Sequence, residues 1–487
     1  GAPNVFGYVS VPPIIADVSS GQHAPDMEPI VVEATALAAQ GELVEATLHY
    51  RVGYGVEQLA GMLPQGDHRF AGLIPASVAG PGELVRWYVT ALDDHGQTSR
   101  YPAFLDPLDS SEYLGTVVHD PEVVTNLPLY QWFSQNPNGF RTDNGARGTL
   151  FYDGELYDNI YVNLHGQSTK GMPKKSYNVD FNKDHRFAWG PGLERMKDIN
   201  ILTTYADKAR VRNTMGYGVF QDAGHVSHLV QPVRLHENGA YIGLYDAVED
   251  PDEAWLERVG LGGDGALYKM YNTLNNTNGG EKKTRKDEGK EDLQALISGL
   301  DAQGEALKAF VFDHVSVPGM INYLAATIAT GGRDCGHKNY YAYRDTNGTG
   351  EWWFLPWDMD LTFGHTWTPE HHYYDDWMYF DHDLYICGSN KLISLLYAMP
   401  TVWEMYARRV RSVLDLLLQP PGTPYNERHY EARIDAISAL IGDDAFDDHA
   451  LWGSWGDQQT VAEGVQNLKD GHLEPRRQYL YVDIPEA

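Results

Sequence analysis

The sequence predicts an α+β protein in which a small all-β sandwich precedes a larger domain that contains both strands and helices. Three observations support this fold class. Apolar and polar residues alternate in short runs up to about residue 107, strand-like runs and hairpin turns continue to about residue 250, and runs with helical spacing dominate from Glu291. A chain of 487 residues is also longer than one ordinary domain.

The amino-acid composition argues against several classes of protein and of binding partner. Hydrophobic residues make up 43% of the chain, with 12 Trp and 31 Tyr, which is enough for sizeable cores and argues against a disordered protein. The net charge is −30, from 67 acidic and 37 basic residues, so nucleic acid and anionic membranes are not expected partners. No apolar run approaches the roughly 20 residues that a bilayer requires, so we expect no transmembrane segment.

The N-terminal module is predicted from three alternating runs, PIVVEATAL, VEATLHYRVG and ELVRWYVTALDD. Short strands at this spacing, separated by turns such as DDHG, indicate a β-sandwich over residues 1–112. The run VRWYVTALDDHGQTSRYP is similar to the closing strands of a fibronectin-III or immunoglobulin-like module. Residues 113–124 are predicted to be a linker, and residues 125–487 the second domain.

The second domain changes from strands to helices along the chain. Strands are expected on both sides of a DGE turn at 153–155, in 174–182, and around an ENG turn at 237–239. Residues 272–291 read as a polar loop. Helical spacing is found in four longer stretches and in one earlier stretch, at 207–224, 292–315, 317–330, 392–418 and 428–442.

One stretch of the helical half gathers oxygen ligands around two apolar strands. Asp334 and Asn339 have four residues between them, and Asp358 and Asp360 follow the strand-like run WWFLP. In protein kinases an Asp-x4-Asn segment supplies the acceptor of the substrate hydroxyl proton and a metal ligand. Carboxylates and an amide also suit Mg²⁺. The structural alternative is that Asp334 caps a turn and Asn339 starts a strand.

A second stretch could supply positive charge and backbone donors for phosphate. Gly166 and Ser168 belong to a Gly/Ser/Thr-rich turn, and Lys174 and Lys175 begin the next predicted strand. Strand alternation sends the two lysines to opposite faces, so one can point at phosphates while the other faces solvent. The structural alternative is a surface loop with two solvated lysines.

Six blocks match a known family in order. They are HGQSTKGMPKKSYNVDF, NILTTYADKARVRNTMGYGVFQDAG, RLHENGAYIGLYDAVEDPD, GALYKMY, DCGHKNYYAYRD and FLPWDMDLTFG. Together they resemble the spore-coat protein H (CotH) kinase family from about residue 120 to residue 480. The resemblance implies an atypical, two-lobed, protein-kinase-like domain, with ATP and Mg²⁺ or Mn²⁺ as cofactors.

The resemblance also implies roles on the nucleotide side. Lys175, or its neighbour Lys174, would bind phosphate, and Gly166 with Ser168 would belong to the turn that covers the nucleotide. Glu249 with Asp250 would lie beside the adenine, and Lys269 and Arg212 would line the cleft. The expected nucleotide-binding set is Gly166, Ser168, Lys174, Lys175, Arg212, Glu249 and Lys269.

On the catalytic side, the resemblance makes Asp334 the catalytic base. Asn339 and Asp358 would be metal ligands, with Asp360 in support. Three departures stand out: His165 replaces the family's usual Arg, His337 lies one place earlier than the family's His-Asn pair, and the DKARVRN helix offers no clear acidic partner for the lysine. These departures leave room for a weakened enzyme or a pseudokinase.

The implied function is ATP- and metal-dependent phosphoryl transfer to a Ser/Thr hydroxyl of a protein whose identity the sequence leaves open. The alternatives are a non-catalytic surface, coat or adhesion protein on a pseudokinase fold, and a relative that transfers AMP. The family and the sandwich module lead us to expect an extracellular or cell-envelope location, with association to a cell surface or wall.

Two further features stay open from the residues alone. Cys335 and Cys387 are the chain's two cysteines, and they could form a disulfide or remain two thiols. Residues 364–383 are rich in histidine, namely His365, His371, His372 and His382. A metal site is one interpretation of this segment, but its spacing fits no standard zinc signature, so we favour a substrate-facing insertion.

Overall fold

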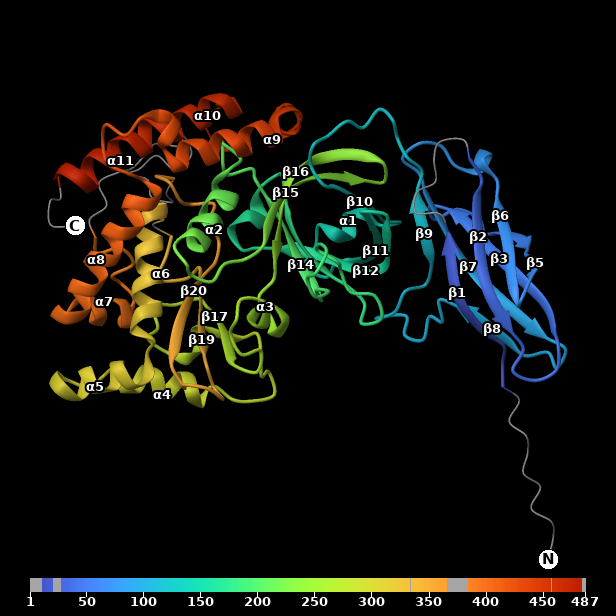
Figure 1. The fold of residues 1–487 in the computed structure, drawn as a ribbon, viewed down its shortest axis with the longest axis horizontal. Helices are drawn as coiled ribbons and strands as arrows, with labels where there is room; N and C mark the ends of the chain where they lie inside the picture. The colour runs from blue at the N-terminus through green and yellow to red at the C-terminus, as the bar shows by residue number, and fades with distance from the viewer. Residues whose placement is uncertain (1–10, 21–27, 333, 366–383, 457, 484–487) are drawn as a thin grey trace, which may run out of the picture. The chain divides into compact units, whose positions relative to one another are not determined.

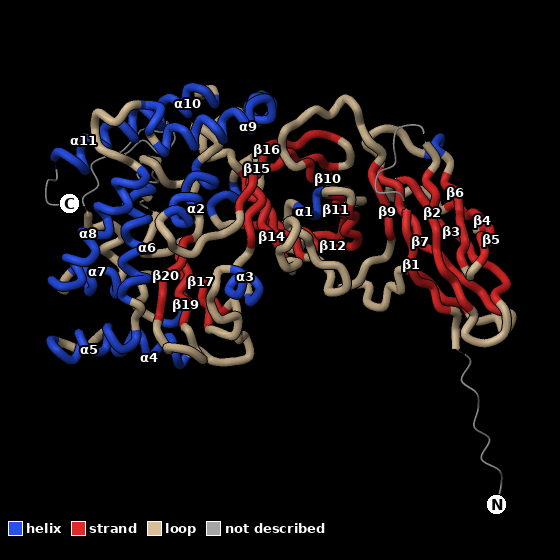
Figure 2. The backbone as a smooth tube through the Cα atoms, viewed as in Figure 1, coloured by secondary structure: helices blue, strands red, loops and turns tan. Residues whose placement is uncertain are grey.

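The computed structural model describes residues 11–20, 28–332, 334–365, 384–456 and 458–483. Strands gather in the first part of the chain and helices in the second, as the red and blue segments of Figure 2 show. This separation confirms the predicted mixed α/β class. The chain divides into two compact units: the first is Gly1–Pro191, Arg195–Ile199 and Val233–Gly243, and the second is Gly192–Glu194, Asn200–Pro232 and Leu244–Ala487.

The N-terminal module is a β-sandwich of two antiparallel sheets, drawn in blue in Figure 1. One sheet has the order β1-β2-β6-β5 and the other β4-β3-β7-β8, with β9 also paired to β7. The strands are β1 Ile14–Ser20, β2 Ile30–Leu37, β3 Leu43–Val52, β4 Gln58–Gly61, β5 Leu63–Gly66, β6 Arg69–Ile74, β7 Leu84–Asp93, β8 Thr98–Tyr101 and β9 Leu114–Val117.

Alternation in the sequence becomes burial in the sandwich. In β2, Ile30, Val32, Ala34 and Ala36 are buried while the residues between them are exposed or half-buried. Ile30, Val32 and Ala34 belong to one core cluster with inward-facing residues of the other strands, including Trp87. The alternation of side chains across a strand therefore correctly predicted the inner face. This confirms the expected all-β module.

The segment predicted as a linker, residues 113–124, contains β9 and is fastened to the sandwich and to the next strands. The carboxylate of buried Asp158 accepts hydrogen bonds from Tyr113 N (2.9 Å) and Thr149 Oγ1 (2.8 Å), and it pairs with Arg86 Nη1 (3.4 Å). Arg86 lies on β7, so one acid joins the sandwich, the connecting segment and the following strands. The connection is thus a packed joint within the first unit.

Seven strands then form a closed barrel in the order β10-β11-β12-β13-β14-β16-β15. The predicted ENG hairpin is confirmed, because Asn238 and Gly239 have the positive φ angles of 50° and 84° that a tight hairpin turn requires. The bounds are β10 Leu129–Phe133, β11 Ala146–Tyr152, β12 Glu155–His165, β13 Ser176–Asp180, β14 Asp198–Thr203, β15 Val230–Glu237 and β16 Ala240–Glu249.

A four-stranded antiparallel sheet in the order β18-β17-β19-β20 belongs to the second unit, with β17 Ala266–Met270, β18 Gly280–Lys282, β19 Tyr340–Arg344 and β20 Trp352–Pro356. The helices are α1 Pro137–Phe140, α2 Arg212–Asp222, α3 Glu253–Arg258, α4 Glu291–Gly299, α5 Gly304–His314, α6 Val317–Thr330, α7 Lys391–Tyr397, α8 Pro400–Leu417, α9 His429–Trp452, α10 Val461–Asn467 and α11 Glu474–Gln478. No helix among the described residues is both long and apolar enough to cross a membrane.

The expected and observed elements differ at several places. The predicted helix over 292–315 is two helices, α4 and α5, with a turn between them at 300–303. The predicted helix over 392–418 is two helices, because Pro400 starts α8 and disfavours helical geometry at the preceding residue. The predicted helix over 207–224 begins only at Arg212, and Asp207 lies ahead of it, where its carboxylate accepts a hydrogen bond from Arg212 N. The polar loop over 272–291 contains β18, which pairs with β17.

Candidate active site

The Asp334–Asn339 segment connects helix α6 to strand β19. Helix α6 ends at Thr330, and Gly331 adopts the left-handed conformation, with φ of 60°, that commonly terminates a helix. Asn339 also has a positive φ of 59°, which asparagine tolerates better than most residues. In this conformation its Nδ2 donates a hydrogen bond to Asp334 Oδ2 at 2.9 Å. The two residues of the Asp-x4-Asn pattern are therefore in direct contact.

Asp334 is an ionised acid surrounded by donors. His337 Nε2 lies 3.2 Å from Oδ1, and Lys338 Nζ lies 3.3 Å from Oδ2. Burial would raise the pKa of Asp334, but the His337 hydrogen bond and the Lys338 charge outweigh it and hold this pKa below its ordinary value. The same contact raises the pKa of His337. A carboxylate accepts about four hydrogen bonds, so the three donors leave room for a further hydroxyl.

Asp358 and Asp360 follow strand β20 in the second unit, and both are half-buried. Asp358 has a φ of 63°, and its N–H donates to Tyr217 Oη at 3.2 Å. The two side chains share a hydrogen bond. Burial raises the pKa of Asp358, with the Asp334 charge adding to it, and burial together with the Asp358 charge raises the pKa of Asp360 well above its ordinary range.

Asp334, Asn339 and Asp358 line one small cavity of about 20 Å³, whose other walls include Phe220, Trp357 and several more side chains. A volume of this size holds about one water molecule or ion. No group of three or more His, Cys, Asp or Glu side chains that could hold a metal was found among the described residues. Mg²⁺ sites in phosphoryl-transfer enzymes use one or two carboxylates plus phosphate and water, so a fuller protein cage is not required.

The donor set fits a divalent cation. The charge of Asp334 raises the pKa of Asp358, and the charges of Asp358 and Asp334 raise the pKa of Asp360, so the negative charges at this place repel one another. A cation bound between Asp358, Asp360 and the amide oxygen of Asn339 would remove that repulsion. Asn339 can supply this oxygen because its Nδ2 is the atom that donates to Asp334.

Lys269, on strand β17, is coupled electrostatically to this acidic group. Burial lowers its pKa, while the charges of Asp250 and Asp358 act in the opposite direction. Its Nζ lies 4.7 Å from the ring centre of Trp357, a cation–π contact that holds the amine beside the aspartate loop. The structure therefore brings Lys269 together with the predicted metal ligands.

Comparison with known proteins agrees with this arrangement of motifs. The family model described as CotH kinase protein matches residues 162–480, about two thirds of the chain. The chain belongs to the CotH kinase family. It is also 27% identical over 263 residues to the inner spore coat protein H of Bacillus subtilis (strain 168), covering 49% of this chain and 70% of the relative. The β-sandwich lies outside the matched residues.

Arg212, which the CotH motifs place in the cleft, is fully buried at the start of α2. Its guanidinium bonds to the carboxylate of Asp207, and its Nε donates to Thr362 O at 3.0 Å. Thr362 follows Asp360 by two residues, so this hydrogen bond supports the loop that carries Asp358 and Asp360. Direct contact with nucleotide stays a prediction for Arg212.

Glu249 and Asp250 are engaged inside the second unit. Glu249 accepts a hydrogen bond from Arg258 Nε at 2.7 Å, and burial raises the pKa of this acid. Asp250 accepts one from Asn200 Nδ2 at 2.7 Å and lies 3.4 Å from Lys283 Nζ. Glu249 is thus a structural ion pair here, whereas Asp250 belongs to the group of charges around Lys269. The adenine contact stays a prediction for both.

The remaining predicted residues lie in the first unit, between β12 and β13. Gly166 has a φ of 92°, and Ser168 begins a short 3-10 turn, Ser168–Gly171. Lys174 is fully buried, whereas Lys175 is half-buried and donates from Nζ to Lys170 O at 2.6 Å. Both lysines precede β13, which begins at Ser176, so they do not begin the strand as predicted, and neither is exposed to solvent.

Three supporting features of this CotH-family chain were not predicted from its sequence. Asp207 falls inside the predicted helix, although an Asp shortly before a helical run is a typical cap signal. Tyr217 lies on helix α2, most of whose residues are buried, and nothing local marks its hydroxyl. The third feature is the disulfide between Cys335 and Cys387, one of the two states that the sequence left open for these residues. His365 lies at the edge of the predicted His-rich insertion, and residues 366–383 lie outside the described residues.

Proposed function

We propose that this chain is an atypical protein kinase that transfers the γ-phosphoryl group of ATP to a Ser/Thr hydroxyl of a protein, with Mg²⁺ or Mn²⁺. The observation that carries the proposal is the direct Asp334–Asn339 contact in the same cavity as Asp358. Membership of the CotH kinase family supports it. Under this proposal residues 125–487 are a two-lobed, kinase-like domain.

In the proposed reaction Asp334 orients the substrate hydroxyl and accepts its proton. Its low pKa makes it a weak base, which suits a loose transition state in which positioning matters more than proton abstraction. Asn339, Asp358 and Asp360 would hold the metal. The metal, when bound, neutralises phosphate charge. Lys269 places a further positive charge beside this group.

The nucleotide's phosphates are proposed to lie against Lys174 or Lys175 and the Gly166–Ser168 turn. The support is the positive φ at Gly166, a glycine that allows close approach of the backbone to a ligand, and the family match that includes these residues. His165 in place of the family's usual Arg would weaken one phosphate contact near neutral pH.

The first test is a thermal shift with ATP, with and without Mg²⁺ or Mn²⁺, on the parent and on Asp358→Ala. A ligand at a hundred times its Kd stabilises by about 2.7 kcal/mol, so a metal-dependent rise in Tm should be readily seen in the parent. Asp358→Ala should lose it. Asp443→Ala, which removes an exposed acid from α9, is the matched control and should keep the shift. No shift in the parent would contradict the nucleotide site.

Transfer itself is tested with Asp334→Ala. The variant should lose roughly 10²- to 10⁴-fold in transfer rate while keeping metal-dependent nucleotide binding. ATP labelled at the γ- or at the α-phosphate separates phosphoryl transfer from AMP transfer. Equal rates in Asp334→Ala and the parent would contradict the role of Asp334.

A second candidate function is that of a non-catalytic coat or surface protein. The relative named inner spore coat protein H favours it, as does the occupation of Asp334 by three donors. Either function would be carried out in the cell envelope or outside the cell. The disulfide supports this location, because disulfides persist in oxidising compartments. Metal-dependent nucleotide binding without transfer to any protein would favour the coat function.

A further inference from the structure

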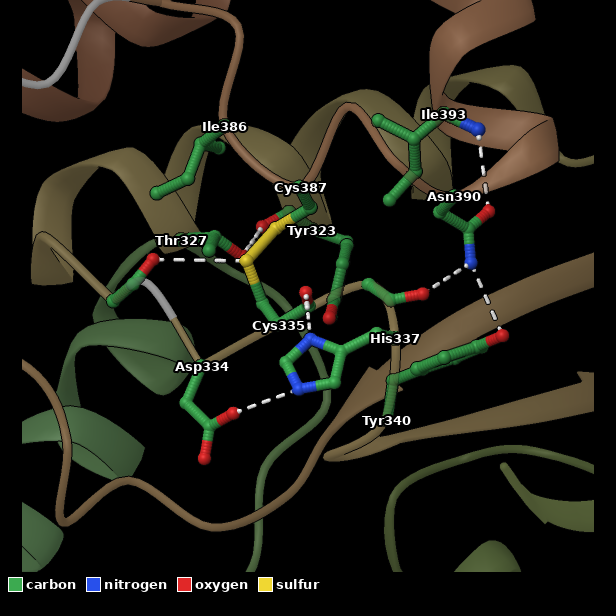
Figure 3. Close-up of a disulfide and its surroundings, with 12 residues drawn as sticks. Tyr323, Thr327, Asp334, Cys335, His337, Tyr340, Ile386, Cys387, Asn390 and Ile393 are labelled. Carbon is green, nitrogen blue, oxygen red and sulfur yellow. Dashed lines mark hydrogen bonds and ion pairs between the residues drawn. A yellow bond between two sulfur atoms is a disulfide. The ribbon is translucent and has the colours of Figure 1, made fainter. Parts of the chain in front are cut away.

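The Cys335–Cys387 disulfide is attached to the residue next to the proposed base. Cys335 directly follows Asp334, and its partner lies 52 positions further along the chain. The covalent ring closed by this bond contains Asn339, Asp358 and Asp360. Figure 3 shows the bond and the residues around it. All the predicted metal ligands therefore lie within one cross-linked loop.

The backbone of the Asp334–Asn339 segment packs directly against the Cys387 end of this ring. A Cβ at Gly336 would lie 2.8 Å from both the Cβ and the carbonyl oxygen of Cys387, so only glycine allows this approach. The φ of Gly336, 77°, favours glycine as well. The disulfide and this close contact together hold the segment at two adjacent residues.

Buried Asn390 adds a third attachment. Its Nδ2 donates to Gly336 O at 2.9 Å and to Tyr340 Oη at 3.1 Å, while its Oδ1 accepts from Leu392 N at the start of α7. Its own N–H donates to Cys387 O at 3.0 Å. Asn390 thus caps helix α7 and also forms hydrogen bonds with both ends of the Gly336–Tyr340 stretch.

The segment that leads into Cys387 is itself held by neighbouring helices. Tyr397 Oη donates to Ile386 O at 3.0 Å, and Tyr406 Oη donates to Leu384 O at 2.8 Å. These tyrosines lie on α7 and α8, so the segment before Asn390 is fixed to two helices. On the other side, His337 bridges the Cys335 carbonyl (Nδ1, 3.2 Å) and Asp334 (Figure 3). A displacement of Cys387 would therefore be transmitted to Asp334 through Cys335, to which Cys387 is bonded, and through His337, which contacts both Cys335 and Asp334.

We propose that the Cys335–Cys387 disulfide, with Asn390, is a positioning device for Asp334, so that the oxidised protein is the competent kinase and reduction releases the segment. This inference rests on the proposed function. A dithiol reductant would donate two electrons and two protons to the S–S bond, leaving two protein thiols and a disulfide in the reductant. The positioning residues act through Asp334 and do not touch substrate.

The experiment compares oxidised and reduced full-length protein by hydrogen–deuterium exchange, by binding of Mg²⁺ with a non-hydrolysable ATP analogue, and by transfer rate. The chain holds two cysteines and both are in this bond, so a reductant has no other disulfide to act on. On reduction, amides of 334–340 should lose about tenfold in protection while those of β17 do not change. The value of kcat should fall roughly 10- to 100-fold, with less change in the KM for ATP.

Two variants are compared, so that the test still gives a result if one of them does not fold. Cys335→Ser/Cys387→Ser should behave like the reduced parent and should not respond to reductant. Asn390→Ser keeps a cap for α7 but removes the amide donor, so it should loosen 334–340 with the disulfide intact. Reoxidation should restore the parent's kcat.

The possible outcomes distinguish the positioning role of the disulfide from its effect on the proposed kinase activity. Unchanged exchange in 334–340 on reduction would overturn the positioning device whatever the activity. Faster exchange with an unchanged kcat would overturn its link to catalysis. If the oxidised parent neither binds the analogue nor transfers phosphate, the proposed function fails and the catalytic claim fails with it, while the exchange data still show whether the disulfide holds the segment.

Discussion

Asp358 and Asp360 are acids whose surroundings disfavour their charged forms. Each is half-buried and partly desolvated, each stands beside the charge of another aspartate, and the two share a hydrogen bond. A protein selected for stability alone would place a neutral side chain at one of these positions. The pair is therefore an arrangement that a bound cation would stabilise, and its energetic cost in the free protein is measurable.

Asp358→Asn should raise the free energy of unfolding of the metal-free protein by about 1 kcal/mol, and with it the Tm, because it removes a charge that desolvation and Asp334 disfavour and keeps the shape. Asparagine also tolerates the positive φ at this position. The measurement is Tm in EDTA and in excess Mg²⁺. The variant should gain stability in EDTA and lose the response to metal; a loss of stability in EDTA would refute this account of the pair.

The buried carboxylate of Asp207 contacts the backbone at the start of helix α2. Asp207 accepts hydrogen bonds from Val211 N and Arg212 N, both at 2.7 Å, and pairs with the Arg212 guanidinium. Burial would raise the pKa of Asp207, but the Arg212 charge and these N–H groups lower it below its ordinary value. One side chain thus caps the helix and neutralises the arginine that supports Thr362.

Asp207→Ala should destabilise the protein by about 3–5 kcal/mol, because it removes the acid that pairs with a buried guanidinium and caps its backbone N–H. Asp252→Ala is the matched comparison: Asp252 caps α3 through Trp255 N at 2.9 Å from a half-buried position, and its loss should cost about 1 kcal/mol. Urea midpoints of the two variants measure the difference. Equal losses would show that capping alone explains Asp207.

At the scale of the whole molecule, the N-terminal sandwich is bound to the barrel strands within the first unit. Asp158 is the centre of that joint, and the Arg86 guanidinium that pairs with it also stacks on Tyr54 and Tyr113 at 4.3 and 4.6 Å. Ser111 N donates to Asp184 Oδ2 at 3.0 Å, and Tyr54 Oη donates to Phe133 O at 2.8 Å. The module is held by several polar contacts spread along its connection.

Asp158→Ala should release the connecting segment, because it removes the acceptor for Tyr113 N and leaves buried Arg86 without its acidic partner. Limited proteolysis should then cut within 106–124 at least about tenfold faster than in the parent. Asp120→Ala, in the same segment, is the control and should be cut at nearly the parent's rate. Cutting that is no faster in Asp158→Ala would argue against this joint.

The first unit should also lose stability in acid through Glu155. Burial would raise the pKa of Glu155, but hydrogen bonds from His185, Arg195 and Tyr157 outweigh it and lower this pKa to about 2. Its folded-state pKa is depressed, so its contribution is complete above an unfolded pKa of about 4.3 and is lost as the pH falls towards 2. After discounting for solvent screening, we expect about 1–2 kcal/mol.

The measurement is the free energy of unfolding of the parent and of Glu155→Gln between pH 6 and pH 2. The difference between the two should be constant near neutral pH and should shrink as the pH falls below about 4. A difference that stays constant down to pH 2 would show that Glu155 does not titrate with folding.

The sequence by itself determined the order of strands and helices, the inner face of the sandwich and the positions of Asp334, Asn339, Asp358 and Asp360, because these depend on local periodicity and short motifs. Tertiary structure alone decided what surrounds them. Arg212 meets Thr362 across 150 residues, and Cys335 meets Cys387 across 52. Such pairings depend on how distant elements pack, and no local pattern in the chain specifies them.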